Sequence, residues 1–245
     1  MKVTAIIPSR FGSSRFAGKP LAPIAGIPMI QRVYERIRQA PDVTDIAVAT
    51  DDRRIYEAVT AFGGKCLMTG GQCRSGTDRV AEAAAQLELA DEDIVVNIQG
   101  DQPLIAPETV EATIVPLLDR PADFAMTTAA FAIVNPREKT DPKDVKMVLD
   151  RDGFALYFSR AAIPFARDGE TDFEMYKHLG IYAYTRKFLD IFTKLPNGRL
   201  EEIEKLEQLR ALEFGYRIRT VITPHDSPEV DIPEDIKRIE DQLTD

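Results

Sequence analysis

A basic loop that follows the first apolar segment offers the clearest chemistry in this chain. The apolar segment spans residues 3–8, and residues 10–19 then hold Arg10, Arg15 and Lys19 with two glycines and two serines. Three cations at this density suit a triphosphate, because Arg and Lys donate charged hydrogen bonds to phosphate oxygens. The alternative is a solvated basic turn. The position of the loop directly after a buried strand favours the phosphate site.

The loop matches neither of two common nucleotide-binding motifs. When Gly18-Lys19 is aligned on a Walker A motif, Ser13 stands where the first glycine belongs and Pro20 where the Ser/Thr belongs. A GxGxxG pattern is also missing, which argues against a dinucleotide. The residues therefore indicate a longer loop that holds a triphosphate in another way.

Two carboxylates are candidate ligands for a metal ion. Asp101 comes directly after Gly100 and the apolar segment 94–97, and Asp231 precedes a predicted helix. Mg²⁺ takes one or two protein carboxylates together with phosphates and water, so either position suits it. Each aspartate could instead cap a helix. The residues alone leave this open for Asp101 and favour the cap for Asp231.

Two further polar positions have a functional and a structural interpretation. Ser75 and Thr77 follow Arg74 at a predicted loop-to-helix junction, where they could contact a nucleobase or cap the helix. Taken alone, the cap is favoured. His178 opens an apolar strand pattern, and a histidine in that place is more often a hydrogen-bonded structural residue than a ligand.

Composition narrows the class of protein. The chain has 245 residues and a net charge of −9, so it lacks the basic excess that a nucleic-acid partner requires. No apolar run approaches the ~18 residues of a membrane span, and the first ten residues do not resemble a signal peptide. We therefore expect a cytoplasmic protein with no membrane partner. Cys66 and Cys73 are expected to be free thiols.

Alternating strand and helix patterns must position these groups. The first half predicts strands over residues 3–7, 45–50, 66–68 and 94–97, and helices over residues 29–40, 53–62, 77–87 and 108–118. This alternation of strands and helices predicts an α/β fold with a Rossmann-like, mostly parallel sheet flanked by helices. Ligands bind beyond the carboxyl ends of such strands, where the basic loop, Asp51-Asp52 and Asp101 would meet.

The second half of the chain is less regular. Strands are predicted over residues 125–131, 145–149, 155–158, 179–184 and 218–222, and helices over residues 186–192, 202–213 and 233–243. The predicted buried stripe of the helix over 202–213 is Ile203, Leu206, Leu209 and Leu212. We expect one domain over residues 1–245, in which about 120–185 form an inserted, partly antiparallel lobe.

Six motifs together resemble the family of 3-deoxy-D-manno-octulosonate (Kdo) cytidylyltransferases. They run in the family's order, and the resemblance extends from about Val3 to Ile236. The motifs are Arg10…Ser13…Arg15…Gly18-Lys19-Pro20-Leu21, Ser75-Gly76-Thr77-Asp78-Arg79, Asn97-Ile98-Gln99-Gly100-Asp101, Ala155-Leu156-Tyr157-Phe158-Ser159-Arg160, His178-Leu179-Gly180-Ile181-Tyr182 and Leu206-Glu207-Gln208-Leu209-Arg210. The first motif is shared with other sugar nucleotidyltransferases, whereas the later ones are much more specific.

The resemblance implies that CTP and Kdo give CMP-Kdo and pyrophosphate, with Mg²⁺ as cofactor, as a step towards lipopolysaccharide. The catalytic residues it implies are Lys19, Arg10, Asp101 and Asp231, of which Asp101 and Asp231 are the metal ligands. The nucleotide-binding residues it implies are Arg10, Ser13, Arg15, Lys19, Arg74, Ser75 and Gln99. The residues it implies for the acidic eight-carbon sugar are Gln99, Arg160, His178, Tyr182, Glu207 and Gln208. It also implies a homodimer, with the lobe at about 120–185 serving sugar binding or dimerisation.

Two departures from the family pattern stand beside the predicted metal ligands. Gln102 occupies a position where many relatives have Glu, and Ile232 stands where Thr is common before Pro233. The first change removes a charge and bears on the choice between Kdo and its 8-amino analogue, an alternative that stays open. An enzyme for a sialic-acid-like sugar is disfavoured by the sugar-side motifs. An inactive nucleotide-binding homologue is disfavoured by intact Lys19, Asp101 and Asp231.

Overall fold

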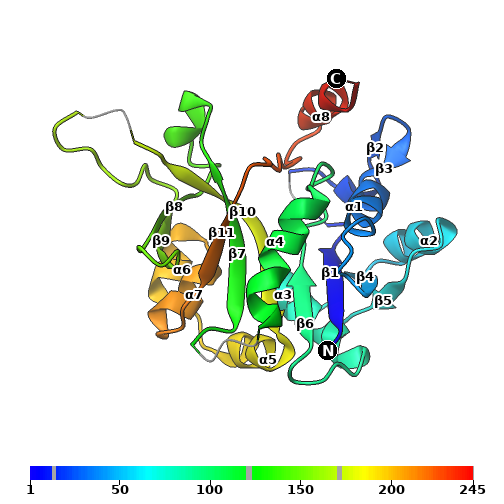
Figure 1. The fold of residues 1–245 in the computed structure, drawn as a ribbon. Helices are drawn as coiled ribbons and strands as arrows, with labels where there is room; N and C mark the ends of the chain where they lie inside the picture. Colours follow the sequence, from blue (N-terminus) through cyan, green and yellow to red (C-terminus); the bar gives the residue numbers. More distant parts are fainter. Residues whose placement is uncertain (13–14, 120–122, 170–172, 245) are drawn as a thin grey trace.

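One nine-stranded sheet organises the protein in a computed structural model that describes residues 1–12, 15–119, 123–169 and 173–244 (Figure 1). Its main path runs in the order β11-β7-β10-β6-β1-β4-β5, and β8 and β9 lie off this path beside β10. The strands of the path are β1 (Val3–Ser9), β4 (Asp45–Thr50), β5 (Cys66–Met68), β6 (Ile94–Asn97), β7 (Met126–Ala132), β10 (Tyr176–Thr185) and β11 (Arg219–Thr223). The outlying strands are β8 (Lys146–Leu149) and β9 (Ala155–Ser159).

The main path of the sheet is parallel except for β10. This strand runs antiparallel to β6 on one side and to β7 on the other, whereas β1, β4, β5, β6, β7 and β11 share one direction. The predicted fold class is confirmed, with a mostly parallel sheet and antiparallel strands in the second half. Because β10 is reversed, its first residues lie beside the carboxyl ends of its neighbours.

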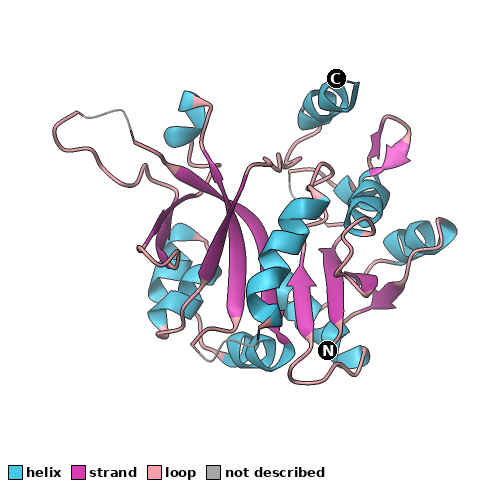
Figure 2. Cartoon of the chain, viewed as in Figure 1, coloured by secondary structure: helices cyan, strands magenta, loops and turns pink. Residues whose placement is uncertain are grey.

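Helices cover both faces of this sheet (Figure 2). They are α1 (Met29–Ile37), α2 (Arg53–Ala61), α3 (Gly76–Gln86), α4 (Pro107–Leu118), α5 (Arg186–Lys194), α6 (Arg199–Glu204), α7 (Gln208–Glu213) and α8 (Asp235–Thr244). Short elements complete the chain: η1 (Lys19–Leu21), the hairpin β2 (Pro23–Ile24) and β3 (Ile27–Pro28), and η2 (Pro136–Lys139). None of the helices formed by the described residues is long and apolar enough to cross a membrane.

Two apolar cores, one on each face, hold the layers together. Ile6 and Ile7 of β1 are both fully buried, and they belong to different cores because successive side chains of a strand point to opposite faces. The core around Ile7 is covered by α1, α2 and α4, and the core around Ile6 by α3, α5 and α7. Burial on both faces explains why the central strands appear in the sequence as continuous apolar runs.

The predicted helix over 202–213 was wrong as a single element. Lys205 adopts a left-handed conformation (φ 56°, ψ 46°) at the end of α6, and α7 begins only at Gln208. The Leu206 N–H bonds back to the Glu201 carbonyl at 3.3 Å, which closes the first helix. Ile203 of the expected buried stripe is consequently 67% exposed, while Leu206 and Leu209 are buried.

Candidate active site

A cavity of about 1080 Å³ lies beyond the carboxyl ends of β1 and β6, next to the first residues of β10. In Figure 1 this end of the sheet lies below α8. Nine of the predicted site residues line it: Arg15, Gln99, Asp101, Arg160, His178, Tyr182, Glu207, Gln208 and Asp231. The fold therefore brings nucleotide-side and sugar-side candidates, which are scattered over more than 200 residues, to a single cavity.

Lys19 forms an ion pair with Asp101, which lines this cavity. The Lys19 Nζ lies 2.5 Å from Asp101 Oδ2 and donates to the Val230 carbonyl at 3.0 Å. The Val230 N–H in turn donates to the Asp101 carbonyl at 3.0 Å, which ties the C-terminal segment to the end of β6. Asp101 does not cap a helix, because α4 begins at Pro107. Its Oδ1 is buried and has no hydrogen-bond partner among the described residues.

Asp231 is held by two cations from distant segments. Arg15 Nη2 lies 3.2 Å from Asp231 Oδ1, and Lys143 Nζ lies 3.6 Å from Oδ2. The Asp231 N–H donates to Asp235, where α8 begins, so the Asp231 side chain is not the cap that its position suggested. Two cations thus hold the Asp231 carboxylate at the wall of the cavity.

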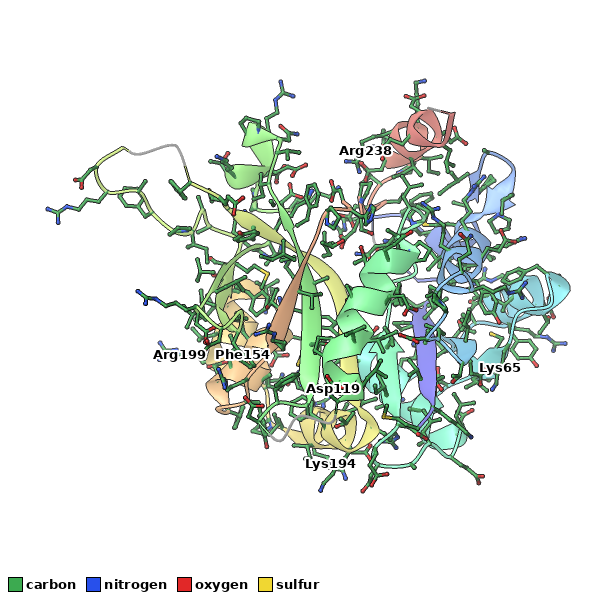
Figure 3. All side chains as sticks on the ribbon, viewed as in Figure 1. Lys65, Asp119, Phe154, Lys194, Arg199 and Arg238 are labelled. Carbon is green, nitrogen blue, oxygen red and sulfur yellow. The ribbon has the colours of Figure 1, made fainter. Side chains whose placement is uncertain are left out.

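Glu229 is a third carboxylate of the cavity, and the sequence analysis missed it. Burial, together with the negative charges of Asp101 and Asp231, raises the pKa of Glu229 to about 7. Gln102 Nε2 lies 3.4 Å from Glu229 Oε1 and also donates to the Leu179 carbonyl. Gln102 is fully buried, and the side chain thus links the end of β6 to the start of β10. Arg238 of α8, labelled in Figure 3, donates to the Glu229 carbonyl at 2.9 Å.

The segment 75–77 begins α3 at the floor of the cavity. Ser75 Oγ accepts the Asp78 N–H at 3.1 Å, so the predicted helix cap is confirmed. Thr77 donates its hydroxyl to Glu207, and Gly76 lines the cavity. Burial raises the pKa of Glu207, while the hydrogen bond from Thr77 opposes this shift. The turn that separates α6 from α7 places Glu207 beside Thr77, and both Glu207 and its neighbour Gln208 line the cavity.

Gln208 and Arg160 have hydrogen-bonding capacity that the described residues do not use. Gln208 is 2% exposed, yet its Nε2 has no partner among those residues. Arg160 donates Nε to the Glu204 carbonyl at 2.8 Å and Nη1 to the Pro142 carbonyl at 2.9 Å. These carbonyls fix the plane of the guanidinium at the cavity wall. Both side chains suit a polar ligand that is rich in oxygen atoms.

His178 stands at the start of β10, packed between two aromatic rings. Its ring centroid lies 5.1 Å from that of Phe158 and 5.2 Å from that of Tyr182. Its Nε2 lies 2.8 Å from Thr128 Oγ1, and burial lowers the pKa of the imidazole to about 3. His178 is therefore neutral at physiological pH, and it is both a structural residue and part of the cavity wall.

Five predicted nucleotide-binding residues are not placed in the cavity wall: Arg10, Ser13, Lys19, Arg74 and Ser75. Arg10 is exposed and makes no ion pair with any described residue, and exposed Arg74 pairs with Asp78 at 3.4 Å. Lys19 contacts Asp101, which lines the cavity, and Ser75 precedes Gly76, which also lines it. Ser13 lies outside the described residues. The roles of all the predicted site residues remain predictions.

Lys143 and Glu229 are among the cavity residues that sequence reasoning did not identify. Lys143 lies in a charged loop, Asp141-Pro142-Lys143-Asp144, without any motif. Glu229 could have been found, because it lies two residues before Asp231, and both line the cavity.

The carboxylates of the cavity fit a Mg²⁺ ion. Asp101 Oδ1 is buried without a partner in the described part of the chain, and Asp231 and Glu229 supply further oxygens. Oxygen donors are the ligands that Mg²⁺ prefers. Within residues 1–12, 15–119, 123–169 and 173–244, no cluster of three His, Cys, Asp or Glu side chains is arranged to hold a metal alone. Mg²⁺ does not require such a cluster, since it commonly keeps water and phosphate ligands.

Comparisons with known proteins show the family of this chain. A family model described as Cytidylyltransferase matches residues 4–218. The 3-deoxy-manno-octulosonate cytidylyltransferase of Desulfosudis oleivorans is 75% identical over 240 residues, which are 98% of this chain and 96% of that protein. The 8-amino-3,8-dideoxy-manno-octulosonate cytidylyltransferase of Shewanella amazonensis is 58% identical over 243 residues, which are 99% of each chain.

A solved structure has the same fold over its whole length. It is a CMP:2-keto-3-deoxy-manno-octonic acid synthetase complexed with CTP, and it matches with a TM-score of 0.93 at 43% identity. The match covers 100% of this chain and 99% of that one. Together with the family model and the similar sequences, this likeness shows that the chain belongs to the cytidylyltransferase family.

Proposed function

We propose that this protein transfers the cytidylyl group of CTP to Kdo, giving CMP-Kdo and pyrophosphate on the route to lipopolysaccharide. The observation that carries the proposal is the shared cavity, into which the fold gathers nine residues of the nucleotide-side and sugar-side motifs. The 75% identity to a 3-deoxy-manno-octulosonate cytidylyltransferase supports the choice of sugar.

The reaction needs positioning and charge rather than a protein nucleophile. The anomeric hydroxyl of the sugar attacks the α-phosphorus, a P–O bond to that oxygen forms, and the bond to pyrophosphate breaks as the hydroxyl proton is lost. Lys19 and Arg15 would stabilise the charge on the phosphates. Arg160 would bind the sugar carboxylate, because its guanidinium is already oriented by two backbone carbonyls. Because the site would hold both reactants in line for the attack, the reaction would have the rate advantage of an intramolecular reaction.

Mg²⁺ is the proposed cofactor, with Asp101 and Asp231 as its protein ligands. When bound, the ion supplies positive charge against phosphate and sugar oxygens. The chain contributes the oxygen donors and the neighbouring Lys19 and Arg15, whose ion pairs hold the two aspartates in place. Gln99, whose side chain lies near both Gly76 and Gly180, would contact the nucleotide and the sugar.

The 8-amino analogue of Kdo is a second candidate substrate. Support comes from the 58% identity to the enzyme of Shewanella amazonensis, whose name specifies that sugar. Buried Glu229 in the cavity also offers a carboxylate that suits an ammonium group. We regard Kdo as the first candidate because the relatives that are 75% and 64% identical carry its name.

A cytoplasmic homodimer is the proposed working form. Within the segment at about 120–185, which we propose to serve sugar binding or dimerisation, Val134, Leu156 and Phe165 are 78%, 59% and 85% exposed. Large apolar side chains on a surface favour a protein interface. Sedimentation velocity of the wild type and of Phe165→Ser would test this proposal, since a dimer should weaken in the variant.

The deciding experiment is Mg²⁺-dependent pyrophosphate release with CTP, UTP, ATP or GTP, each combined with Kdo or the 8-amino sugar. Release with CTP and Kdo supports the proposal. A large preference for the amino sugar keeps the reaction and changes the substrate. No release with any pair would overturn the proposed activity and favour an inactive nucleotide-binding protein.

A further inference from the structure

Thr128 of β7 connects the His178 ring to a backbone carbonyl of the next strand. Its Oγ1 lies 2.8 Å from His178 Nε2 and donates to the Ile181 carbonyl at 2.7 Å. Thr128 is fully buried. The pairing of β10 with β7 shifts register between His178 and Tyr182, and Ile181 lies within that shifted stretch. The threonine therefore has two fixed partners and no access to water.

The hydroxyl of Thr128 has one proton, and the Ile181 carbonyl can only accept it. Thr128 Oγ1 must then accept a hydrogen bond from His178, which requires the proton of the neutral imidazole to be on Nε2. The other ring nitrogen, Nδ1, is left as an acceptor. Burial lowers the pKa of His178 to about 3, so a second ring proton is not expected near neutral pH.

Nδ1 of His178 is the nitrogen that remains for a ligand. His178 lines the cavity, and no described residue forms a hydrogen bond with Nδ1. The rings of Phe158 and Tyr182 pack against the imidazole and hold its orientation. An acceptor nitrogen cannot bind a carboxylate or a phosphate that has no proton to donate, but it can bind a hydroxyl.

We propose that Thr128 is a positioning residue that fixes His178 as the Nε2–H tautomer, so that Nδ1 accepts a hydrogen bond from a hydroxyl of the sugar. This inference rests on the proposed function for the identity of the ligand. The proposal gives two residues different roles, because Arg160 would bind the carboxylate of the sugar and His178 would bind one of its neutral hydroxyl groups.

The tautomer can be measured without any substrate. The chain has two histidines, so ¹⁵N-histidine labelling gives two imidazoles, and His225→Gln, which changes an exposed loop residue, assigns the signals. We expect long-range ¹H–¹⁵N spectra at pH 7 to show Nε2 of His178 protonated and Nδ1 not. A protonated Nδ1, or fast exchange between the two forms, would overturn the proposal even if the enzyme is active.

Substitution of Thr128 then tests the consequence for binding. Thr128→Val removes the acceptor and would leave Nε2–H buried without a partner, so the proton should move to Nδ1. We expect the KM for the sugar to rise about tenfold, as for the loss of one hydrogen bond, with the KM for CTP within twofold of wild type. Thr128→Ser keeps the hydroxyl and should restore both the tautomer and the sugar KM.

A series of sugar analogues, each lacking one hydroxyl, identifies the partner of Nδ1. The analogue that lacks the hydroxyl bound by Nδ1 should bind the wild type and Thr128→Val equally weakly, because it cannot form this hydrogen bond with either protein.

An equal rise of the KM for the sugar and the KM for CTP in Thr128→Val, or an unchanged KM for the sugar, would overturn the proposal. If Thr128→Val does not fold, the wild-type spectrum and Thr128→Ser still decide. Inactivity of the wild type with every sugar would refute the proposed function, whereas the spectrum tests the tautomer independently.

Discussion

Lys19 and Asp101, which are 82 residues apart in the sequence, form an ion pair in which Nζ lies 2.5 Å from Oδ2. The pair is mostly buried, with side-chain exposures of 16% and 22%. Only one oxygen of the Asp101 carboxylate, Oδ2, contacts Lys19, and Oδ1 has no hydrogen-bond partner among the described residues. This half-satisfied carboxylate at the end of β6 can bind one more positive group without losing its lysine.

Asp101→Asn tests that capacity. The amide keeps the size of the side chain but removes its charge, so we expect kcat to fall by at least about 10²-fold, comparable to the loss of one charge-stabilising group. Pyrophosphate release at saturating CTP, sugar and Mg²⁺ measures the effect, and circular dichroism checks the fold. Asp119→Asn, an exposed change at the end of α4 (Figure 3), is the matched control and should leave kcat unchanged. Turnover within fivefold of wild type in Asp101→Asn would refute the role of Asp101.

Arg160→Lys should affect the sugar and not the nucleotide. Arg160 Nη2 has no partner among the described residues, while Nε and Nη1 are held by two carbonyls. Lysine cannot reproduce this fork geometry, so we expect the KM for the sugar to rise roughly 10- to 100-fold. Steady-state kinetics with each substrate varied in turn separates the two KM values. Arg199→Lys, an exposed site on α6, is the control. A rise in the KM for CTP alone would assign Arg160 to the nucleotide.

Gly180→Ala should destabilise the start of β10. Gly180 has φ 66°, a conformation that costs residues with a Cβ roughly 1–2 kcal/mol. A Cβ there would lie 3.5 Å from Glu229 Oε1, an ordinary contact, so the penalty comes from the backbone. Urea denaturation should show a free energy of unfolding lower by about 1–2 kcal/mol. Gly71→Ala, which meets open space, is the control and should change little. Equal stability of the two variants would contradict this explanation.

Asp93 should make stability depend on acid pH. Burial acts to raise the pKa of Asp93, but hydrogen bonds from the Lys2 and Ala90 N–H groups outweigh it and hold that pKa below 3.8. Because the pKa of Asp93 is lower in the folded than in the unfolded protein, the carboxylate stabilises the fold at pH values above its unfolded-state pKa. This stabilisation is lost as the pH falls through the folded-state pKa. Asp93→Asn should therefore unfold more easily than wild type at pH 7, by roughly 1 kcal/mol. The difference should shrink below about pH 4.

Urea titrations at several pH values measure the effect of Asp93→Asn. Asp119→Asn serves again as the exposed control and should show no such dependence. A difference between wild type and Asp93→Asn that stays constant from pH 7 to pH 3 would show that the carboxylate charge is not involved.

The central strands could be predicted because burial on both faces leaves a local signal. Ile6 and Ile7 are consecutive apolar residues in different cores, which is the pattern of a parallel strand between two helix layers. The break at Lys205 could not be predicted in this way. The spacing of Leu206 and Leu209 continues the apolar pattern of one helix, and only the tertiary environment selects the left-handed turn between them.

The composition of the cavity was only partly accessible from the sequence. Motifs and family resemblance identified Asp101 and Asp231, but no spacing rule brings together two residues 130 positions apart. Lys143 and Glu229 contribute charges through tertiary proximity alone. His178 had a structural and a functional interpretation. The structure confirms the first, since one ring nitrogen contacts Thr128, and it places the ring in the cavity wall, where the functional role stays a prediction.

The bond from Lys19 to the Val230 carbonyl has a consequence for biosynthesis on the ribosome. The basic loop is translated before Val230 and Asp231, which follow it by more than 200 residues. A nascent chain that ends between residues 101 and 230 thus contains Lys19 and Asp101 but neither the Val230 carbonyl nor Asp231. With the role that we propose for Asp231, such a chain would contain most of the sheet and be inactive, and activity would depend on synthesis past that residue.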